Sequence, residues 1–347
     1  MQNKLLCYTL KYNEYFCYVN IMKRRLSFFI ILSLTILHIQ AQDKASMASY
    51  QQRLNDLFES VYNAPTDNER YLANETALQL LGKALDEENS FKWKWKFGNR
   101  VSVLTASDGK FRIFTWPVRR DNGEIECFGI IQAYDSEEEE WVVSMLHDKS
   151  EELFNIEESF FSPEQWFGAV YQELVEVTHD GNRFYVLLGW TQVDMLTQRK
   201  VMEPVWFKKK SAVPIFGQPI FRRDNNRRRL VLQYSNNAMV NMRYETQFTR
   251  RVEKKRVKKK GMKGTTIETI NHDEKERMII FDEVAPQIPG MEGLFQYYVP
   301  TGEEWAYVFR EGKWDLKRNA QGRLDDKRLN KDFAPLPKSA PQYGVGR

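Results

Sequence analysis

The chain has few of the residues and motifs that usually indicate a function. Its 347 residues include three cysteines and four histidines. It contains no GxSxG nucleophile elbow, no HExxH zinc helix, no Walker phosphate loop and no GxGxxG dinucleotide turn. No CxxC pair suggests a zinc site, and three cysteines cannot build a disulfide framework. We therefore expect neither a metal nor a cofactor, and we favour a non-catalytic protein over an enzyme.

Long apolar runs are also lacking, since none reaches the roughly 18 to 20 residues that a membrane span needs. A shorter apolar segment, 26–39, follows three consecutive basic residues (23–25) and precedes Ala41. This order is typical of a secretory signal peptide. It predicts a signal peptide over 22–41, cleaved after Ala41, and a mature protein in the periplasm or at the cell exterior. Residues 1–21 do not fit such a leader, and we interpret them as a non-native upstream extension.

Loss of this leader balances the charge of the chain. Residues 1–41 hold five basic residues and one acidic residue, so the mature chain has 51 − 5 = 46 basic and 47 − 1 = 46 acidic residues. Its total charge therefore gives no reason to expect a nucleic acid partner. Two of the three cysteines are lost as well, and we expect the remaining one, Cys127, to be buried rather than reactive.

Hydrophobic periodicity divides the mature chain into four parts. Residues 42–90 form a helical segment, in which a Thr-x-x-Glu capping box (66–69) precedes the second helix. Residues 91–155 change to a period of two and form a first antiparallel β region. Residues 156–324 form a helix plus a second antiparallel β region, and the proline-rich tail 325–347 is expected to be disordered. The predicted fold class is α+β, mainly antiparallel β, with amphipathic helices packed on the sheets.

Turns and one further helix complete this prediction. Asp-Gly pairs at 108–109 and 180–181 separate alternating runs, and such pairs supply the positive φ of tight hairpin turns. A mid-chain helix is predicted over 162–175, because a Ser-Pro start precedes an apolar stripe at helical spacing. The runs that end at Trp116 and Trp190 both follow an Asp-Gly turn, which suggests an internal duplication. Chance similarity between two short runs is the alternative.

Four strand motifs resemble a family of exported proteins from Bacteroidetes-type bacteria. They are DGKFRIFTW (108–116), FYVLLGW followed by TQRKV (184–201), RMIIFDEVAP (277–286) and FREGKWDL (309–316). The resemblance implies export and a β-rich body, and it carries over no activity, cofactor or site residue. The basic stretch that begins at residue 250 is an insertion relative to the family's pattern.

That basic stretch is the candidate binding segment of the chain. Between residues 250 and 263, nine side chains are Lys or Arg and one, Glu253, is acidic. Such a run can contact an anionic polymer or an anionic envelope surface, and a solvated hairpin loop without a partner is the alternative. A protein partner is a further alternative. The candidate binding residues are Arg250, Arg251, Lys254, Lys255, Arg256, Lys258, Lys259, Lys260 and Lys263.

The two halves of the mature chain carry opposite charge. Residues 42–200 hold 16 basic and 28 acidic residues, a net of −12, whereas residues 201–347 hold 30 and 18, a net of +12. Opposite fields of this size favour docking of the halves, or head-to-tail contacts between molecules. The alternative is that two loops, 137–140 and 250–263, dominate the count.

Histidines and carboxylates keep an enzymatic alternative open. Histidines 147, 179 and 272 each precede an aspartate, a pair that can ligate a metal or act as a base but that also suits a turn. A glycosidase needs two carboxylates held across a cleft. The nine tryptophans are expected to fill the core rather than to stack on sugars. We thus expect a non-catalytic structural or binding module of the bacterial envelope; the alternative is a carboxylate-based envelope hydrolase, directed at carbohydrate.

Overall fold

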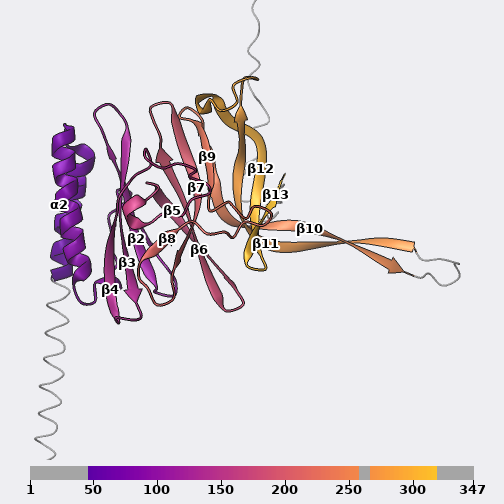
Figure 1. The fold of residues 1–347 in the computed structure, drawn as a ribbon, viewed down its shortest axis with the longest axis horizontal. Helices are drawn as coiled ribbons and strands as arrows, with labels where there is room; N and C mark the ends of the chain where they lie inside the picture. Colours follow the sequence, from indigo (N-terminus) through magenta and orange to yellow (C-terminus); the bar gives the residue numbers. More distant parts are fainter. Residues whose placement is uncertain (1–45, 258–265, 319–347) are drawn as a thin grey trace, which may run out of the picture.

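The computed structural model describes residues 46–257 and 266–318. Two helices and three antiparallel sheets follow one another along the long axis of the molecule, and a two-stranded ribbon projects beyond the last sheet (Figure 1). The predicted α+β fold, mainly antiparallel β, is confirmed. The predicted signal peptide 22–41, the extension 1–21 and the tail 325–347 lie outside the described residues. In the described part of the chain, no helix combines the length and the apolar character that a bilayer span requires.

The helical layer consists of a helix over 46–63 and of α2 (Asp67–Asp86). The predicted capping box begins α2: the Thr66 hydroxyl accepts from the Glu69 backbone N–H, and the Glu69 carboxylate accepts from the Thr66 N–H. These bonds satisfy backbone donors that a helix start leaves without intrahelical partners. A short turn, η1 (Ser90–Lys92), then leads the chain to the first sheet.

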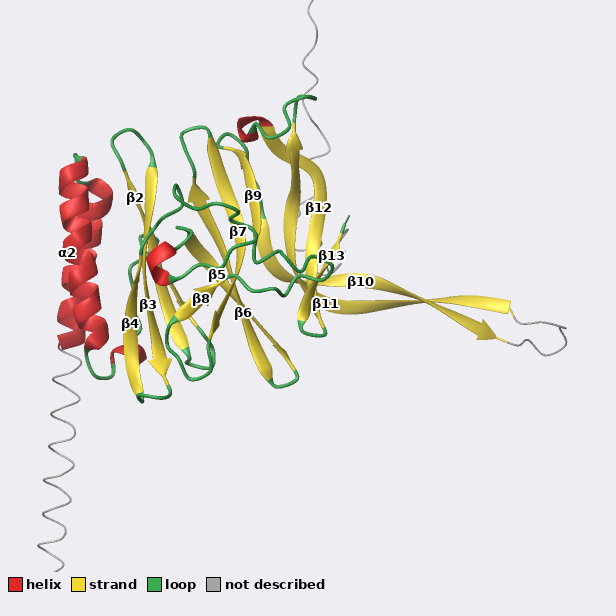
Figure 2. Cartoon of the chain, viewed as in Figure 1, coloured by secondary structure: helices red, strands yellow, loops and turns green. Residues whose placement is uncertain are grey.

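The helix-side sheet lies directly against these helices (Figure 2). Its strands alternate between two cores, because successive side chains of a strand point to opposite faces. Phe114 and Ile130 face the helices, whereas Ile113 and Ile131 face the next sheet. Across the sheet, the strands are β1 (Ser102–Thr105), β2 (Phe111–Arg119), β3 (Ile125–Asp135) and β4 (Glu140–Leu146).

The central sheet is covered on both of its faces. Leu187 and Val201 belong to the core shared with the helix-side sheet, and Val186 and Met202 to the core shared with the third sheet. Its strand β7 pairs with β6, β8 and β9. The strands are β5 (Val170–His179), β6 (Asn182–Gln192), β7 (Thr197–Phe207), β8 (Pro214–Phe216) and β9 (Leu230–Ser235).

The predicted mid-chain helix over 162–175 is wrong. The structure has a single short turn there, η2 (Pro163–Gln165), and then strand β5. Two features imitate a helical stripe. β5 lies in a sheet buried on both faces, so its apolar residues do not alternate cleanly. A register shift between Tyr171 and Glu173 also changes the phase of the pattern in the middle of the run.

A fully buried ion pair lies in the core between the first two sheets. Glu203 on β7 accepts from Arg229 Nε at 2.7 Å, and both side chains have no exposed surface. The second Glu203 oxygen accepts from the Tyr171 hydroxyl, which in turn accepts from Trp166 Nε1 at 2.9 Å. The guanidinium also donates to the Phe216 carbonyl at 3.3 Å. Because every charged atom has a partner, the network joins four segments of the chain without leaving a bare charge.

The third sheet carries the ribbon and completes the stack. Ile279 and Tyr307 pack against the central sheet, and Ile280 and Val308 lie on the opposite face. The predicted second β region, 156–324, therefore holds two sheets. The strands are β10 (Met242–Val257), β11 (Thr266–Pro286), β12 (Tyr298–Arg310) and β13 (Lys313–Lys317), with η3 (Phe295–Tyr297) before β12.

The suggested internal duplication is not supported by the two tryptophans that motivated it. Trp116 is fully buried beneath the helices, where its ring meets Phe58 at a centroid distance of 5.2 Å and its Nε1 donates to Asn74 Oδ1 at 2.7 Å. Trp190 is half-buried and donates to Gln198 on the neighbouring strand. The expected burial of Cys127 is confirmed, and burial raises the pKa of its thiol.

Candidate functional sites: a projecting ribbon and a carboxylate-lined pocket

The ribbon is the outer part of the β10–β11 hairpin. The two strands pair over 16 positions, of which the inner four, 242–245 with 278–281, lie beside or within the third sheet. The outer twelve pairs, 246–257 with 266–277, run beyond the end of the β11–β12 ladder, and we call them the ribbon. At about 3.3 Å per residue the ribbon is about 40 Å long. It leaves the body at the end opposite the helices (Figure 1).

The structure places five of the nine predicted binding residues on the ribbon: Arg250, Arg251, Lys254, Lys255 and Arg256 all lie in β10. The other four, Lys258, Lys259, Lys260 and Lys263, fall outside the described residues. These five residues lie in a strand and not in a loop, because they are paired in the ladder. Their partner segment, TIETIN at 266–271, is rich in β-branched residues, which favour strands.

The register divides the ribbon's charge between two faces. Even-numbered positions of β10 share one face with odd-numbered positions of β11. This face, which we call the basic face, carries Arg250, Lys254 and Arg256 among residues 250–257, and across from them one acid, Asp273. The other face carries two basic and two acidic residues over the same span: Arg251, Lys255, Glu253 and Glu268. The basic character is therefore one-sided.

The ribbon also has two strand edges. Within the described residues, neither edge pairs with a third strand. A two-stranded hairpin without a third strand or a covering layer is marginally stable in water, and unpaired backbone groups along an edge are a template for contact with another chain. Within the described residues, both edges of the ribbon are therefore available for contact with another chain.

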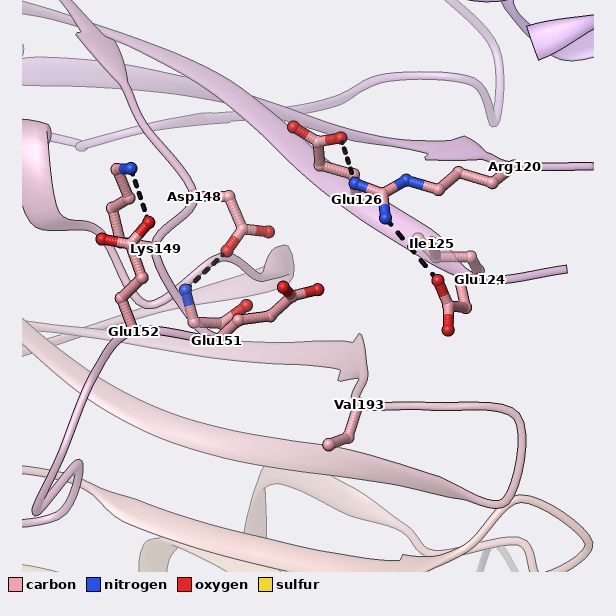
Figure 3. A pocket seen from close by; sticks show the side chains of 10 residues that line it. Arg120, Glu124, Ile125, Glu126, Asp148, Lys149, Glu151, Glu152 and Val193 are labelled. Atoms are coloured by element: carbon pink, nitrogen blue, oxygen red, sulfur yellow. Dashed lines mark hydrogen bonds and ion pairs between the residues drawn. The ribbon is translucent and has the colours of Figure 1, made fainter. Parts of the chain in front are cut away.

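A second candidate site is a small polar pocket beside the helix-side sheet (Figure 3). It lies between the β2–β3 turn, the start of β3 and the loop that follows β4. Five carboxylates and two basic side chains line it together with Ser150, Ile125 and Val193: Glu124, Glu126, Asp148, Glu151, Glu152, Arg120 and Lys149.

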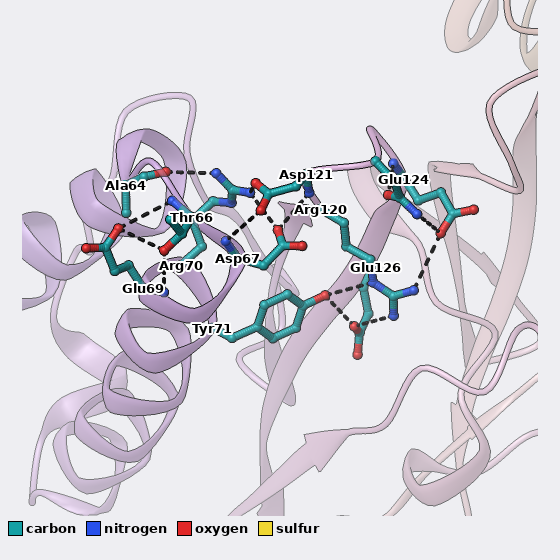
Figure 4. Close-up of polar contacts among 11 residues, drawn as sticks. Ala64, Thr66, Asp67, Glu69, Arg70, Tyr71, Arg120, Asp121, Glu124 and Glu126 are labelled. Atoms are coloured by element: carbon teal, nitrogen blue, oxygen red, sulfur yellow. Dashed lines mark hydrogen bonds and ion pairs between the residues drawn. The ribbon is translucent and has the colours of Figure 1, made fainter.

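One wall of the pocket is a polar network that also holds α2 (Figure 4). Arg120 Nη2 lies 3.0 Å from Glu126 Oε2, and Arg120 Nε donates to the Tyr71 hydroxyl at 3.1 Å. Tyr71 donates to the same Glu126 oxygen at 2.7 Å, and burial raises the pKa of Tyr71 to about 12. Beside it, Arg70 forms ion pairs with Asp67 at 2.6 Å and with Asp121. Glu126 is thus engaged in positioning the helix.

Asp148 is the most unusual acid of this pocket. Burial raises its pKa, and the nearby Glu126 charge acts in the same direction. Its two oxygens accept from the backbone N–H groups of Cys127 and Ser150, each at 3.0 Å. Gly168, at φ +72°, passes so close that a Cβ there would lie 2.2 Å from the carboxyl group. The loop after β4 is therefore built around this carboxylate.

The geometry gives this pocket little room for a substrate. Its cavity holds about 110 Å³, whereas small-molecule sites measure about 300 to 1,000 Å³. The described residues contain no cluster of His, Cys, Asp and Glu that could hold a metal ion. What remains is a buried acid with two backbone donors, which suits a structural anchor at least as well as a proton donor.

The sequence indicates only a part of this pocket. The sequence indicates Asp148 only as a member of the pair His147–Asp148, but the pocket joins it to the β2–β3 turn, which lies about 25 residues earlier in the chain. The pair His179–Asp180 lies at the exposed β5–β6 turn, with Nε2 and Oδ2 3.2 Å apart, as a turn assignment predicts. The third His-Asp pair, at 272–273, lies on the ribbon.

Comparison of the chain with protein-family models, with characterised proteins and with solved structures gave no match. The candidate sites therefore stand on their own geometry.

Proposed function

We propose that this chain is an exported, non-catalytic structural or binding module of the bacterial envelope, and that the ribbon is its contact element. The observation that carries the proposal is the twelve-pair ladder beyond the third sheet, with no further strand on either edge in the described residues. Export follows from the signal peptide that the sequence predicts.

The charge of the ribbon indicates the kind of partner. The paired residues of the ribbon hold seven basic and five acidic residues, and its basic face carries five of the basic residues against one acid, in a mature chain whose total is zero. Basic charge concentrated at one end of a neutral molecule attracts an anionic surface to that end and not to the molecule as a whole. We therefore propose an anionic partner for the ribbon.

Retention on heparin resin tests this proposal. In one variant, residues 248–275 are replaced by an Asn-Gly turn, which keeps the inner ladder and closes the hairpin with a favoured turn. The full chain should elute at clearly higher salt than this variant, and circular dichroism should show that both have the same body. Equal elution of two folded proteins would refute the proposal.

The hydrolase alternative rests on one observation, the raised pKa of Asp148 in a pocket shared with Glu126. A general acid needs such a shift. The small cavity and the engagement of Glu126 by Arg120 and Tyr71 weigh against it. Hydrolysis of a cell-wall or polysaccharide substrate that disappears in Asp148→Asn, with the fold retained, would reverse our preference.

A further inference from the structure

The two ends of the molecule carry opposite charge. The helical layer, residues 46–90, holds three basic and eight acidic residues, a net of −5. The paired residues of the ribbon, 246–257 and 266–277, lie at the opposite end of the long axis and have a net of +2, and the basic face has a net of +4 (Figure 1). The opposite charges of the two sequence halves therefore include two surfaces at opposite ends of the molecule.

The acids of the helical layer are available to a partner. Asp56, Glu75, Asp86 and Glu88 are exposed, and none has an ion-pair partner among the described residues. Glu75 lies within α2, and Glu88 lies just after the end of that helix. These exposed carboxylates give the helical layer its acidic character.

We propose that the anionic partner of the ribbon is a second copy of this chain, and that the basic face of one ribbon docks on the acidic helical layer of the next molecule. The inference rests on the proposed function, in which the ribbon is the contact element. Because the two surfaces differ, the contact is head-to-tail, and repetition of it produces a ring or an open row of molecules.

Pairing of one ribbon with another ribbon is the competing arrangement, and the structure disfavours it. A twofold pairing of two β10 edges would align two strands that each carry five basic residues and one acid between 250 and 257. If ribbons paired side by side in one continuous sheet, each molecule would contribute two strands, so neighbouring molecules would lie about 10 Å apart. The third sheet alone has four strands, so it is about 19 Å wide, and the bodies would collide.

Sedimentation velocity on the purified protein tests the inference with three charge-reversal variants. The ribbon variant is Lys254→Glu with Arg256→Glu, on the basic face. Its matched control is Arg251→Glu with Lys255→Glu, the same charge change on the opposite face. The helix variant is Glu75→Lys with Glu88→Lys.

The wild type should form assemblies larger than a monomer at about 50 mM salt, and these should dissociate at about 500 mM, where charges are screened within a few ångströms. The ribbon variant and the helix variant should each sediment as monomers, because each loses most of the charge of one of the two surfaces that meet. An equimolar mixture of these two should form one-to-one pairs, since the unchanged ribbon of the helix variant meets the unchanged helical layer of the ribbon variant. The opposite-face control should retain assembly.

A last control addresses the position of the acids. Glu292 and Glu303 are exposed on the ribbon side of the body, and Glu292→Lys with Glu303→Lys should leave assembly intact. Failure of the mixture to assemble, or a wild type that is monomeric at low salt, overturns the inference. If the wild type is monomeric but the ribbon variant still loses heparin retention, the proposed function stands with a different anionic partner. If heparin retention is unchanged as well, the proposed function fails too.

Discussion

The buried ion pair between Arg229 and Glu203 provides the sharpest test of how the body is held together. Arg229→Met keeps a long unbranched side chain over the Phe161 ring, whose centroid lies 4.0 Å from the guanidinium carbon. It leaves the Glu203 carboxylate fully buried with the Tyr171 hydroxyl as its remaining donor. Removal of one partner from a buried pair costs about 3–5 kcal/mol, so we expect the free energy of unfolding to fall by that amount.

Urea denaturation of the purified protein measures this loss. The midpoint should fall while the slope with urea stays constant, because the surface exposed on unfolding is unchanged. Lys149→Met is the matched control, since Lys149 forms an exposed pair with Glu152 at 2.8 Å, and such pairs contribute less than about 1 kcal/mol.

A double variant measures the interaction between the two charges apart from their contacts with other residues. Glu203→Leu combined with Arg229→Met removes both charges, so it should cost less than the sum of the two single changes by about 1–3 kcal/mol. If Arg229→Met alone costs no more than the surface control, the reasoning is refuted, because the carboxylate would then be stable without its partner.

Three further predictions concern the pocket and the helix-side core. Gly168→Ala should destabilise the fold by about 2–4 kcal/mol in the same assay, because it combines a left-handed backbone with a clash against Asp148; no loss would show that the loop can move aside. Burial raises the pKa of Asp148, so its proton is held more tightly in the folded chain, and its stabilising contribution is complete below the ordinary pKa of about 3.9 and is lost as pH rises through the folded value. The stability advantage of the wild type over Asp148→Asn should therefore shrink as pH is raised from about 4, and an advantage that grows with pH would contradict the shift. Trp116→Phe should cost about 1–3 kcal/mol in thermal or urea unfolding, since Asn74 then keeps a buried oxygen without its donor; a change within error would argue that water replaces the indole.

Much of the fold could be predicted because its signals are local. The capping box at Thr66 and the Asp-Gly turns at 108–109 and 180–181 act over four residues or fewer, and the structure shows each of them. The strands of the helix-side sheet are buried on both faces, so their prediction rested largely on the turns between them. The prediction for β5 failed because a Ser-Pro start precedes it and a register shift changes the phase of its apolar residues.

The candidate sites depended on relations that sequence spacing does not show. The nine basic residues were visible as a run, but their division between two faces of a ribbon requires the register with β11. The pocket joins Arg120 to Asp148 across three separate segments. The pairing of Glu203 with Arg229 is likewise a product of the sheet, because no local rule connects two charges 26 residues apart.

The two strands of the ribbon continue directly into the third sheet, and this continuity has a mechanical consequence. β11 runs for 21 residues, and its inner half is bonded to β12 on one side and packed against the central sheet. A pull applied to the distal end therefore loads the interior of the body without an intervening tether. A partner bound to the ribbon would therefore rotate together with the body, and the partner would in turn fix the orientation of the body.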